Sequence, residues 1–242
     1  MRDSPLKQAL LRAYFSAGEV RSALLGMVRT PQPLRYESNY DEYWQLREPG
    51  ALQPRFHLMA DQLEPGASLL DVGCGDGALL ELLVQRGVRA VGIDVSEVAV
   101  LAARRRGVSA EVRTLDDLAQ SGASYDYVVL SEVLEHVADP ERMVCVAWGL
   151  CRKALFLTFP NIAYLPHRLR LAAGRFPVQW AVFPGEHLRF WAVPDFRDWL
   201  RGLGLPEGRI EPSNGIVVFG LHRRWPNLFA NQVVVRVDRA AQ

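Results

Sequence analysis

The feature that most constrains the fold is an alternation of short apolar strands and helices in the first half of the chain. Residues 68–72 (SLLDV) are predicted to form a strand, 78–87 a helix and 88–94 (VRAVGID) a second strand, followed by a helix over 96–107. Successive strand and helix units of this kind build a parallel sheet through right-handed crossovers. The sequence therefore predicts an α/β, Rossmann-like, doubly wound fold.

The same alternation continues toward the C-terminus. Strands are predicted over 125–130 and 153–160, with a helix over 139–151 between them. Two β-branched runs, 215–221 and 232–237, are predicted to form a terminal antiparallel strand pair.

Proline-containing residues between the N-terminus and this region indicate a boundary. We expect residues 1–35 to form an N-terminal helical arm and residues 36–242 to form one domain. Residues 161–205, which are rich in arginine and aromatic side chains, are expected to be an insertion that covers the substrate opening.

Three glycines at alternate positions, Gly73, Gly75 and Gly77, connect the first strand to the helix after it. A strand, loop and helix in this order place free backbone N–H groups at the carboxyl edge of the sheet, where ligands bind in open α/β folds. Glycine lets the backbone approach a ligand closely. Residues 73–78 also satisfy the relaxed dinucleotide pattern G-x-G-x-x-G/A, so the glycines alone leave NAD open.

Acidic residues around the loop favour a different cofactor. Asp71 and Asp76 would repel a pyrophosphate and cancel the positive field of the helix N-terminus. Asp94 ends the second strand 21 residues after Gly73, where an acid can accept hydrogen bonds from ribose hydroxyls. S-adenosylmethionine carries an ammonium, a sulfonium and a ribose but no phosphate. The loop therefore favours S-adenosylmethionine over NAD.

The motif LLDVGCGDG at 69–77 resembles the cofactor-binding motif of class I S-adenosylmethionine-dependent methyltransferases, and VGIDVS, YDYVVLSEVLEHVADP and LFLTFPN follow in the order of that family's later motifs. The segments FPNIAYLPHRLRLAAGRFP and EHLRFWAVPDFRDWLRGLGL are similar to the MetW-like group and to neighbouring type 11 or type 23 methyltransferases. The resemblance covers residues 36–237. It implies a seven-stranded sheet whose last strand is antiparallel.

The resemblance also implies the residues of the cofactor site. It places the three glycines against the cofactor, Asp94 on the ribose, and Ser131 at the edge that faces cofactor and substrate. Many relatives carry an aspartate near the adenine after the third strand, where this chain has Thr114 and Leu115, so the adenine contact stays open. The predicted cofactor-binding set is Asp71, Gly73, Cys74, Gly75, Gly77, Asp94, Val95, Thr114, Leu115 and Ser131.

Three side chains are candidates for catalysis. Glu132 and His136 are four residues apart, so on a helix they would share one face, and a histidine beside a carboxylate can act as a general base toward an oxygen acceptor. His187 lies in the insertion, where it could act as a base, contact the substrate or anchor the loop. Local packing is the alternative for His136. No metal site is predicted.

Two residue clusters have alternative interpretations. In similar methyltransferases, a segment such as the aromatic cluster of residues 36–44 folds over the cofactor as a lid, while anchoring of the arm on the sheet is the alternative. The basic residues of 167–175 could form a rim that selects an anionic substrate, or a solvated helix face.

Charge and cysteine content narrow the partners. The chain has 28 basic and 27 acidic residues, and this balance gives no reason to expect nucleic acid. No apolar run approaches the roughly 20 residues of a membrane span, so no membrane partner is expected. Three cysteines without a CxxC pair indicate reduced thiols and a cytoplasmic protein.

The predicted function is methyl transfer from S-adenosylmethionine to an oxygen, nitrogen or carbon of a small molecule. MetW-like relatives are associated with homoserine acyltransferase, so the alternative is a non-catalytic, regulatory protein that binds S-adenosylmethionine and partners an acyltransferase. The amphipathic helices of the N-terminal arm could either cover the protein's own substrate cleft or pair with a second subunit in a homodimer.

Overall fold

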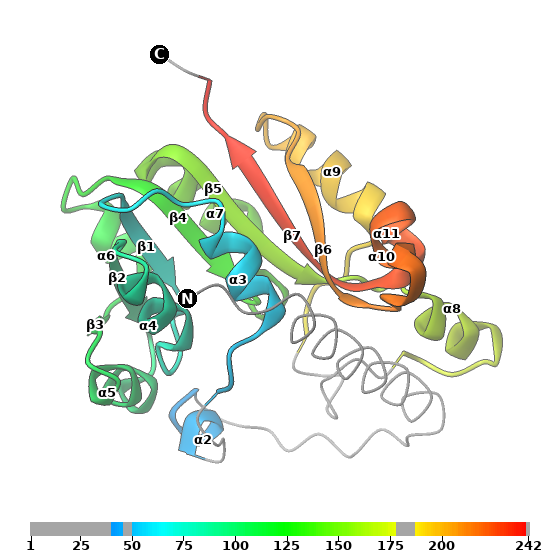
Figure 1. The fold of residues 1–242 in the computed structure, drawn as a ribbon, viewed down its shortest axis with the longest axis horizontal. Coiled ribbons are helices and arrows are strands. Elements are labelled where there is room, and N and C mark those ends of the chain that lie inside the picture. The colour runs from blue at the N-terminus through cyan, green and yellow to red at the C-terminus, as the bar shows by residue number, and fades with distance from the viewer. Residues whose placement is uncertain (1–39, 46–49, 178–186, 241–242) are drawn as a thin grey trace.

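The computed structural model describes residues 40–45, 50–177 and 187–240, and a seven-stranded sheet with helices on both faces forms its centre (Figure 1). The predicted N-terminal arm, residues 1–35, lies outside the described residues. Among the helices that the structure describes, none combines the length and the apolar character needed to cross a membrane.

The strands are β1 (Ser68–Val72), β2 (Arg89–Asp94), β3 (Ser109–Val112), β4 (Tyr125–Ser131), β5 (Cys151–Pro160), β6 (Arg209–Gly215) and β7 (Ala230–Asp238). The α-helices are α2 (Tyr40–Gln45), α3 (Pro54–Ala60), α4 (Ala78–Gln85), α5 (Glu97–Arg105), α6 (Leu115–Ala119), α7 (Pro140–Leu150), α8 (Leu165–Ala172), α9 (Val193–Gly202), α10 (Leu221–Arg224) and α11 (Pro226–Phe229). Short 3-10 helices are η1 (Leu134–His136) and η3 (Val218–Gly220).

The order of the strands across the sheet is β3-β2-β1-β4-β5-β7-β6. Strands β1 to β5 pair in parallel, whereas β7 runs antiparallel to both of its neighbours, β5 and β6. The predicted doubly wound sheet with a reversed last strand is thus confirmed. The usual dinucleotide-binding order is 3-2-1-4-5-6, so the insertion of a reversed strand before β6 separates this fold from that of an NAD enzyme.

Two apolar layers cover the two faces of the sheet, because side chains alternate between faces along each strand. Leu70 and Val72 of β1 face the layer that contains α6, α7 and α9, while Leu69 faces the layer that contains α3, α4 and α5. In the first layer Phe159 of β5 stacks on Phe196 of α9 with ring centroids 4.1 Å apart. Both layers hold the strand ends in fixed positions at the edges of the sheet.

The predicted terminal strand pair is half right. Strand β7 contains the predicted run 232–237, but its partner is β6, and the predicted strand over 215–221 is wrong. Gly215, at a φ of 138°, ends β6, and a Cβ there would lie 2.0 Å from the Phe229 carbonyl oxygen. The chain therefore turns away from the sheet into η3 before its β-branched residues could pair.

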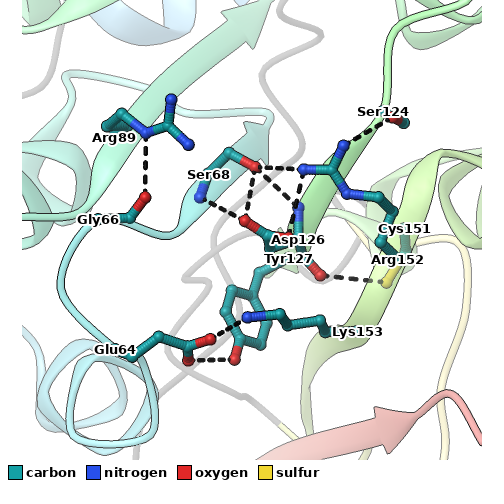
Figure 2. A network of polar contacts seen from close by, with 10 residues as sticks. All are labelled: Glu64, Gly66, Ser68, Arg89, Ser124, Asp126, Tyr127, Cys151, Arg152 and Lys153. Atoms are coloured by element: carbon teal, nitrogen blue, oxygen red, sulfur yellow. Dashed lines mark hydrogen bonds and ion pairs between the residues drawn. The ribbon is translucent and has the colours of Figure 1, made fainter. Parts of the chain in front are cut away.

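A polar network ties together the amino-terminal edge of the sheet, where β1, β4 and β5 begin (Figure 2). The Asp126 carboxylate accepts hydrogen bonds from the backbone N–H and the hydroxyl of Ser68, at 2.9 and 3.0 Å, and pairs with Arg152 at 3.2 Å. Glu64 pairs with Lys153. The backbone bond from Ser68 lowers the pKa of Asp126, and the bond from Lys153 lowers that of Glu64. Every one of these carboxylates has a donor.

Candidate functional site

The glycine loop connects β1 to α4 at the carboxyl edge of the sheet. Gly73, Gly75 and Gly77 have φ angles of 72°, 54° and 77°, a region that side chains other than glycine rarely tolerate. A Cβ on Gly73 would lie 2.6 Å from Val133, and one on Gly75 would lie 2.5 Å from the Trp44 ring. The loop therefore needs glycine for its backbone conformation and for the close approach of groups above it.

Helix α2 lies beside this loop and carries part of the predicted aromatic cluster. Asp41 of α2 accepts hydrogen bonds from the Ser96 hydroxyl and from the Val98 N–H at 3.2 Å, which docks α2 on the N-terminus of α5. The bond from Ser96 lowers the pKa of Asp41. Trp44, from the same helix, lies over Gly75. This position fits the interpretation of the cluster as a lid.

Asp94, at the end of β2, links the loop to the helix that follows. One carboxylate oxygen accepts from the Gly75 N–H and the other from the Ser96 N–H, both at 2.9 Å. Burial raises the pKa of Asp94, and these backbone bonds oppose the rise. Each oxygen has a second lone pair, so the carboxylate can still accept from ribose hydroxyls. The side chain of Val95, next to Asp94, is exposed at the same edge.

Asp71 is the second buried carboxylate of the site. Burial raises its pKa to about 8, the nearby charge of Asp94 adds to the rise, and Arg55 opposes it. Burial and these two charges are the causes of the shift, and none of the described residues donates a hydrogen bond to the Asp71 side chain. A buried carboxylate without a donor is stabilised by a nearby cation. The Asp71 side chain therefore suits the ammonium group of S-adenosylmethionine.

The side chains of two other loop residues, Asp76 and Cys74, are buried. Asp76 pairs with Arg106 at 2.6 Å and accepts from the Gly50 N–H at 2.6 Å, so its charge is neutralised rather than presented to a ligand. The paired Asp76 therefore contributes little to the predicted repulsion of a phosphate, which stays a prediction for Asp71. Cys74 points beneath the loop toward Gly92, and burial raises the pKa of its thiol. Any cofactor contact at Cys74 would come from its main chain.

The predicted adenine contacts follow β3. The Thr114 hydroxyl accepts from the Asp117 N–H at 3.1 Å and caps α6, while the Leu115 side chain is buried in the apolar core. Asp116 pairs with Arg142 on the surface. Thr114 and Leu115 remain predictions as cofactor contacts. Because the Leu115 side chain is buried, a contact there would come from the main chain of Leu115.

The region after β4 holds a polar network that the sequence did not reveal. The Glu132 carboxylate accepts from the Thr158 hydroxyl at 2.8 Å and from the Gln232 amide at 2.7 Å. Arg55 donates to the Ser131 hydroxyl at 3.1 Å and to Gln232 at 3.2 Å. Arg55, Thr158 and Gln232 come from distant parts of the sequence. They meet because β4, β5 and β7 are neighbours in the sheet and α3 packs beside these strands.

The prediction that Glu132 and His136 share one helix face is wrong. Glu132 has a φ of 56°, in the left-handed region, and the 3-10 helix η1 contains only Leu134–His136. Glu132 is therefore directed to β5 and β7, where two donors hold its carboxylate. This arrangement favours a positioning role for Glu132 over that of a base.

His136 instead meets His187. Their ring centroids are 4.8 Å apart with the rings edge to face. Burial and the neighbouring His136 lower the pKa of His187 to about 4. Glu135, which is not among the predicted site residues, is buried with neither carboxylate oxygen hydrogen-bonded and lies next to both rings. Its signal was the run SEVLEH, which places two acids and a histidine within five residues.

The basic residues of 167–175 lie on α8 and just after it, and two of them are buried. His167 and Arg170 are buried, Arg170 donates to the Phe176 carbonyl at 3.0 Å, and Arg168 donates to the Ala163 carbonyl. Burial lowers the pKa of His167 to about 4. These three side chains fasten α8 to the chain around it, whereas Arg175 is exposed, so a rim for an anionic substrate stays a prediction that only part of the set could serve.

Comparisons with known proteins agree with this geometry. The family model of methionine biosynthesis protein MetW matches residues 53–237. Ubiquinone biosynthesis O-methyltransferases are similar: that of Hahella chejuensis is 34% identical over 58% of this chain and 63% of the relative, so the chain spans less than two thirds of that protein. The enzyme of Xanthomonas axonopodis pv. citri is 31% identical over 73% and 76%.

A solved structure has the same fold. The magnesium protoporphyrin IX methyltransferase of Synechocystis PCC 6803, crystallised with bound SAH, superimposes with a TM-score of 0.56 at 20% identity over 96% of this chain and 100% of that one. The family match covers more than half of the chain, and the strand order and glycine loop fit it. The chain belongs to the MetW family and to the class I S-adenosylmethionine-dependent methyltransferases.

Proposed function

We propose that the protein transfers the methyl group of S-adenosylmethionine to an oxygen atom of a small molecule. The observation that carries the proposal is Asp94, buried at the end of β2 and held in place by the N–H groups of Gly75 and Ser96. When bound, S-adenosylmethionine supplies a methyl group on a positively charged sulfur. The similarity to O-methyltransferases favours oxygen over nitrogen and carbon as the acceptor.

The chain's own residues would divide the binding of the cofactor. Asp94 accepts from the ribose hydroxyls, and the buried Asp71 attracts the ammonium group. Gly73 and Gly75 let the cofactor approach the backbone. The exposed Val95 lies beside Asp94, where its side chain can pack on the adenosine.

The acceptor would lie near the carboxyl ends of β4 and β5. Rate then comes mainly from holding the acceptor and the methyl group in contact at the correct angle. Ser131 and Glu132, fixed by Arg55, Thr158 and Gln232, would form the floor of this region. His136, which lies just after β4, and His187 beside it would promote loss of a proton from the acceptor.

Titration calorimetry with S-adenosylmethionine tests the cofactor site. The wild-type protein should bind it, and Asp94→Ala should bind at least about tenfold more weakly, because one lost charge-assisted hydrogen bond is worth about 1.5–3 kcal/mol. Asp198→Ala, an exposed acid on α9, is the control and should bind like the wild type. Circular dichroism establishes that each variant is folded. Wild-type affinity in Asp94→Ala, or tighter binding of NAD, would refute the proposal.

The second candidate function is regulatory, and the match to a model described as a methionine biosynthesis protein favours it. In that case the protein would bind S-adenosylmethionine and a homoserine acyltransferase without methylating a metabolite. A metabolite extract incubated with methyl-labelled cofactor should yield a labelled small molecule if the protein is an enzyme. Co-elution with an acyltransferase, with no labelled product, would support the regulator.

The cellular location and the assembly of the protein are part of the proposal. We place the protein in the cytoplasm, since Cys74, Cys145 and Cys151 are free thiols. Light scattering of the purified chain would distinguish a monomer from a homodimer, and adding an acyltransferase would reveal a hetero-complex.

A further inference from the structure

A cluster of three potential metal ligands lies where η1 meets the segment that precedes α9. Glu135 and His136 belong to η1, and His187 comes from 51 residues further along the chain. One ligand atom from each residue lies within 4.8 Å of the others. The Leu188 N–H donates to the Glu135 carbonyl oxygen at 2.7 Å, which fastens the His187 segment onto η1. The main chain itself thus holds the three side chains together.

The Glu135 carboxylate supplies a second, independent observation. The residue is only 1% exposed, and neither side-chain oxygen has a hydrogen-bond partner. Glu132 lies close enough to disfavour the charge further. A buried carboxylate is costly unless a cation or donors compensate it. Its surroundings therefore favour a positive ion next to His136 and His187.

From this geometry we propose that Glu135, His136 and His187 bind one divalent transition-metal ion. Two imidazole nitrogens and one carboxylate oxygen are a donor set that zinc uses in sites that keep an open coordination position. Magnesium prefers oxygen ligands alone, so a site with two nitrogens disfavours it. The carboxylate of Glu132, held by Thr158 and Gln232, adds negative charge beside the ion.

The location gives the ion a role that rests on the proposed function. The cluster follows β4 directly, and Val133, between Glu132 and η1, lies over Gly73 of the cofactor loop. An open coordination position beside that loop would bind a hydroxyl oxygen of the acceptor. The substrate class is therefore a hydroxyl-bearing small molecule, and the ion would both orient that oxygen and make it more acidic.

Titration calorimetry with zinc sulfate alone tests the site. The untagged full chain is treated with a chelator, dialysed and titrated without any cofactor. We expect one zinc ion per chain and a higher unfolding temperature with zinc. Glu135→Gln and His187→Ala each remove a ligand, so each should weaken binding by more than the roughly 10- to 100-fold effect of losing an outer-shell partner. His57→Asn, which changes an exposed histidine of α3, should bind zinc like the wild type.

Absence of stoichiometric zinc binding would overturn the proposal, and so would tighter binding of magnesium or equal loss of binding in His57→Asn. If His187→Ala does not fold, the nearly isosteric Glu135→Gln decides the result. Titrating S-adenosylmethionine into the same metal-free protein separates the two proposals. Cofactor binding without zinc binding refutes the metal site alone, and zinc binding without cofactor binding refutes the proposed function alone.

Discussion

Carboxylates at the two edges of the sheet differ in their surroundings and in the direction of their pKa shifts. At the amino edge, Asp126 and Glu64 are hydrogen-bonded and paired with basic side chains, and their pKa values are lowered. At the carboxyl edge, Asp71, Asp94 and Glu135 are buried, and their pKa values are raised. The same parallel strands connect the two edges.

The difference separates stability from binding. Charges that are paired within the fold hold strand ends together and leave no field for a ligand. Charges that are buried with few donors cost stability, but they attract cationic groups strongly because water does not screen them. The buried carboxylates at this edge, and the cluster of Glu135 with two histidines, therefore indicate where a cationic cofactor and a metal ion would bind.

The largest expected effect comes from neutralising Asp71. In the folded protein its pKa is about 8, whereas an unfolded aspartate has 3.8. Between these values only the folded state holds the proton, so stability falls as pH rises from about 4 to 8. Asp71→Asn removes this dependence and should be more stable above pH 8 by an amount on the order of 5 kcal/mol.

Urea denaturation of the wild type and of Asp71→Asn at several pH values measures the difference between their free energies of unfolding. The two stabilities should be close near pH 4 and should diverge up to pH 8, and Asp71→Asn should also bind S-adenosylmethionine more weakly. A gap that stays constant with pH would show that Asp71 is not buried as an unpaired acid.

At the amino edge, Asp126→Ala should lower the stability of the protein, whereas Asp71→Asn should raise it. It leaves the Ser68 N–H without its acceptor, so the free energy of unfolding should fall by about 1–3 kcal/mol. Because the folded pKa of Asp126 is lowered, its contribution is present above pH 3.8 and is lost as pH falls through the folded value. Urea denaturation at pH 7 measures the loss, and calorimetry should find unchanged cofactor affinity. Weaker cofactor binding would contradict the separation of the two edges.

The smallest effect is expected at the exposed pair of Lys153 and Glu64. Both side chains are nearly half exposed, and surface ion pairs contribute little to stability. Lys153→Ala should therefore unfold at the same denaturant concentration as the wild type, within the error of the curve. A clear loss would show that the Figure 2 network acts as one unit rather than as separate pairs.

Local patterns were enough to predict the strand, the glycine loop, the helix and the next strand, which ends in Asp94. The spacing from Asp71 through the glycines to Asp94 lies within one strand, helix and strand unit, where periodicity and turn chemistry dictate the geometry. The helices predicted from residues 96 and 139 begin there for the same local reason, since Ser96 and Asp139 each accept a hydrogen bond from a backbone N–H three residues later.

Long-range contacts could not be predicted in this way. The burial of Glu135 and its proximity to His187 depend on how distant segments pack. The contacts of Gln232 depend on β7 lying between β5 and β6 in the sheet. Strand β6 was missed because RIEPSNG is polar and contains a proline, although its partner β7 is strongly β-branched. Pairing with a neighbouring strand outweighed local propensity there.

Strand β6 is an edge strand of the sheet, and its irregular backbone affects whether other molecules can pair with it. Pro212 lacks an N–H group, and the pairing register with β7 shifts twice between Pro212 and Gly215. An outer strand with these defects is a poor template for a strand from another molecule. The feature that hid β6 from sequence patterns thus protects this edge strand against aggregation.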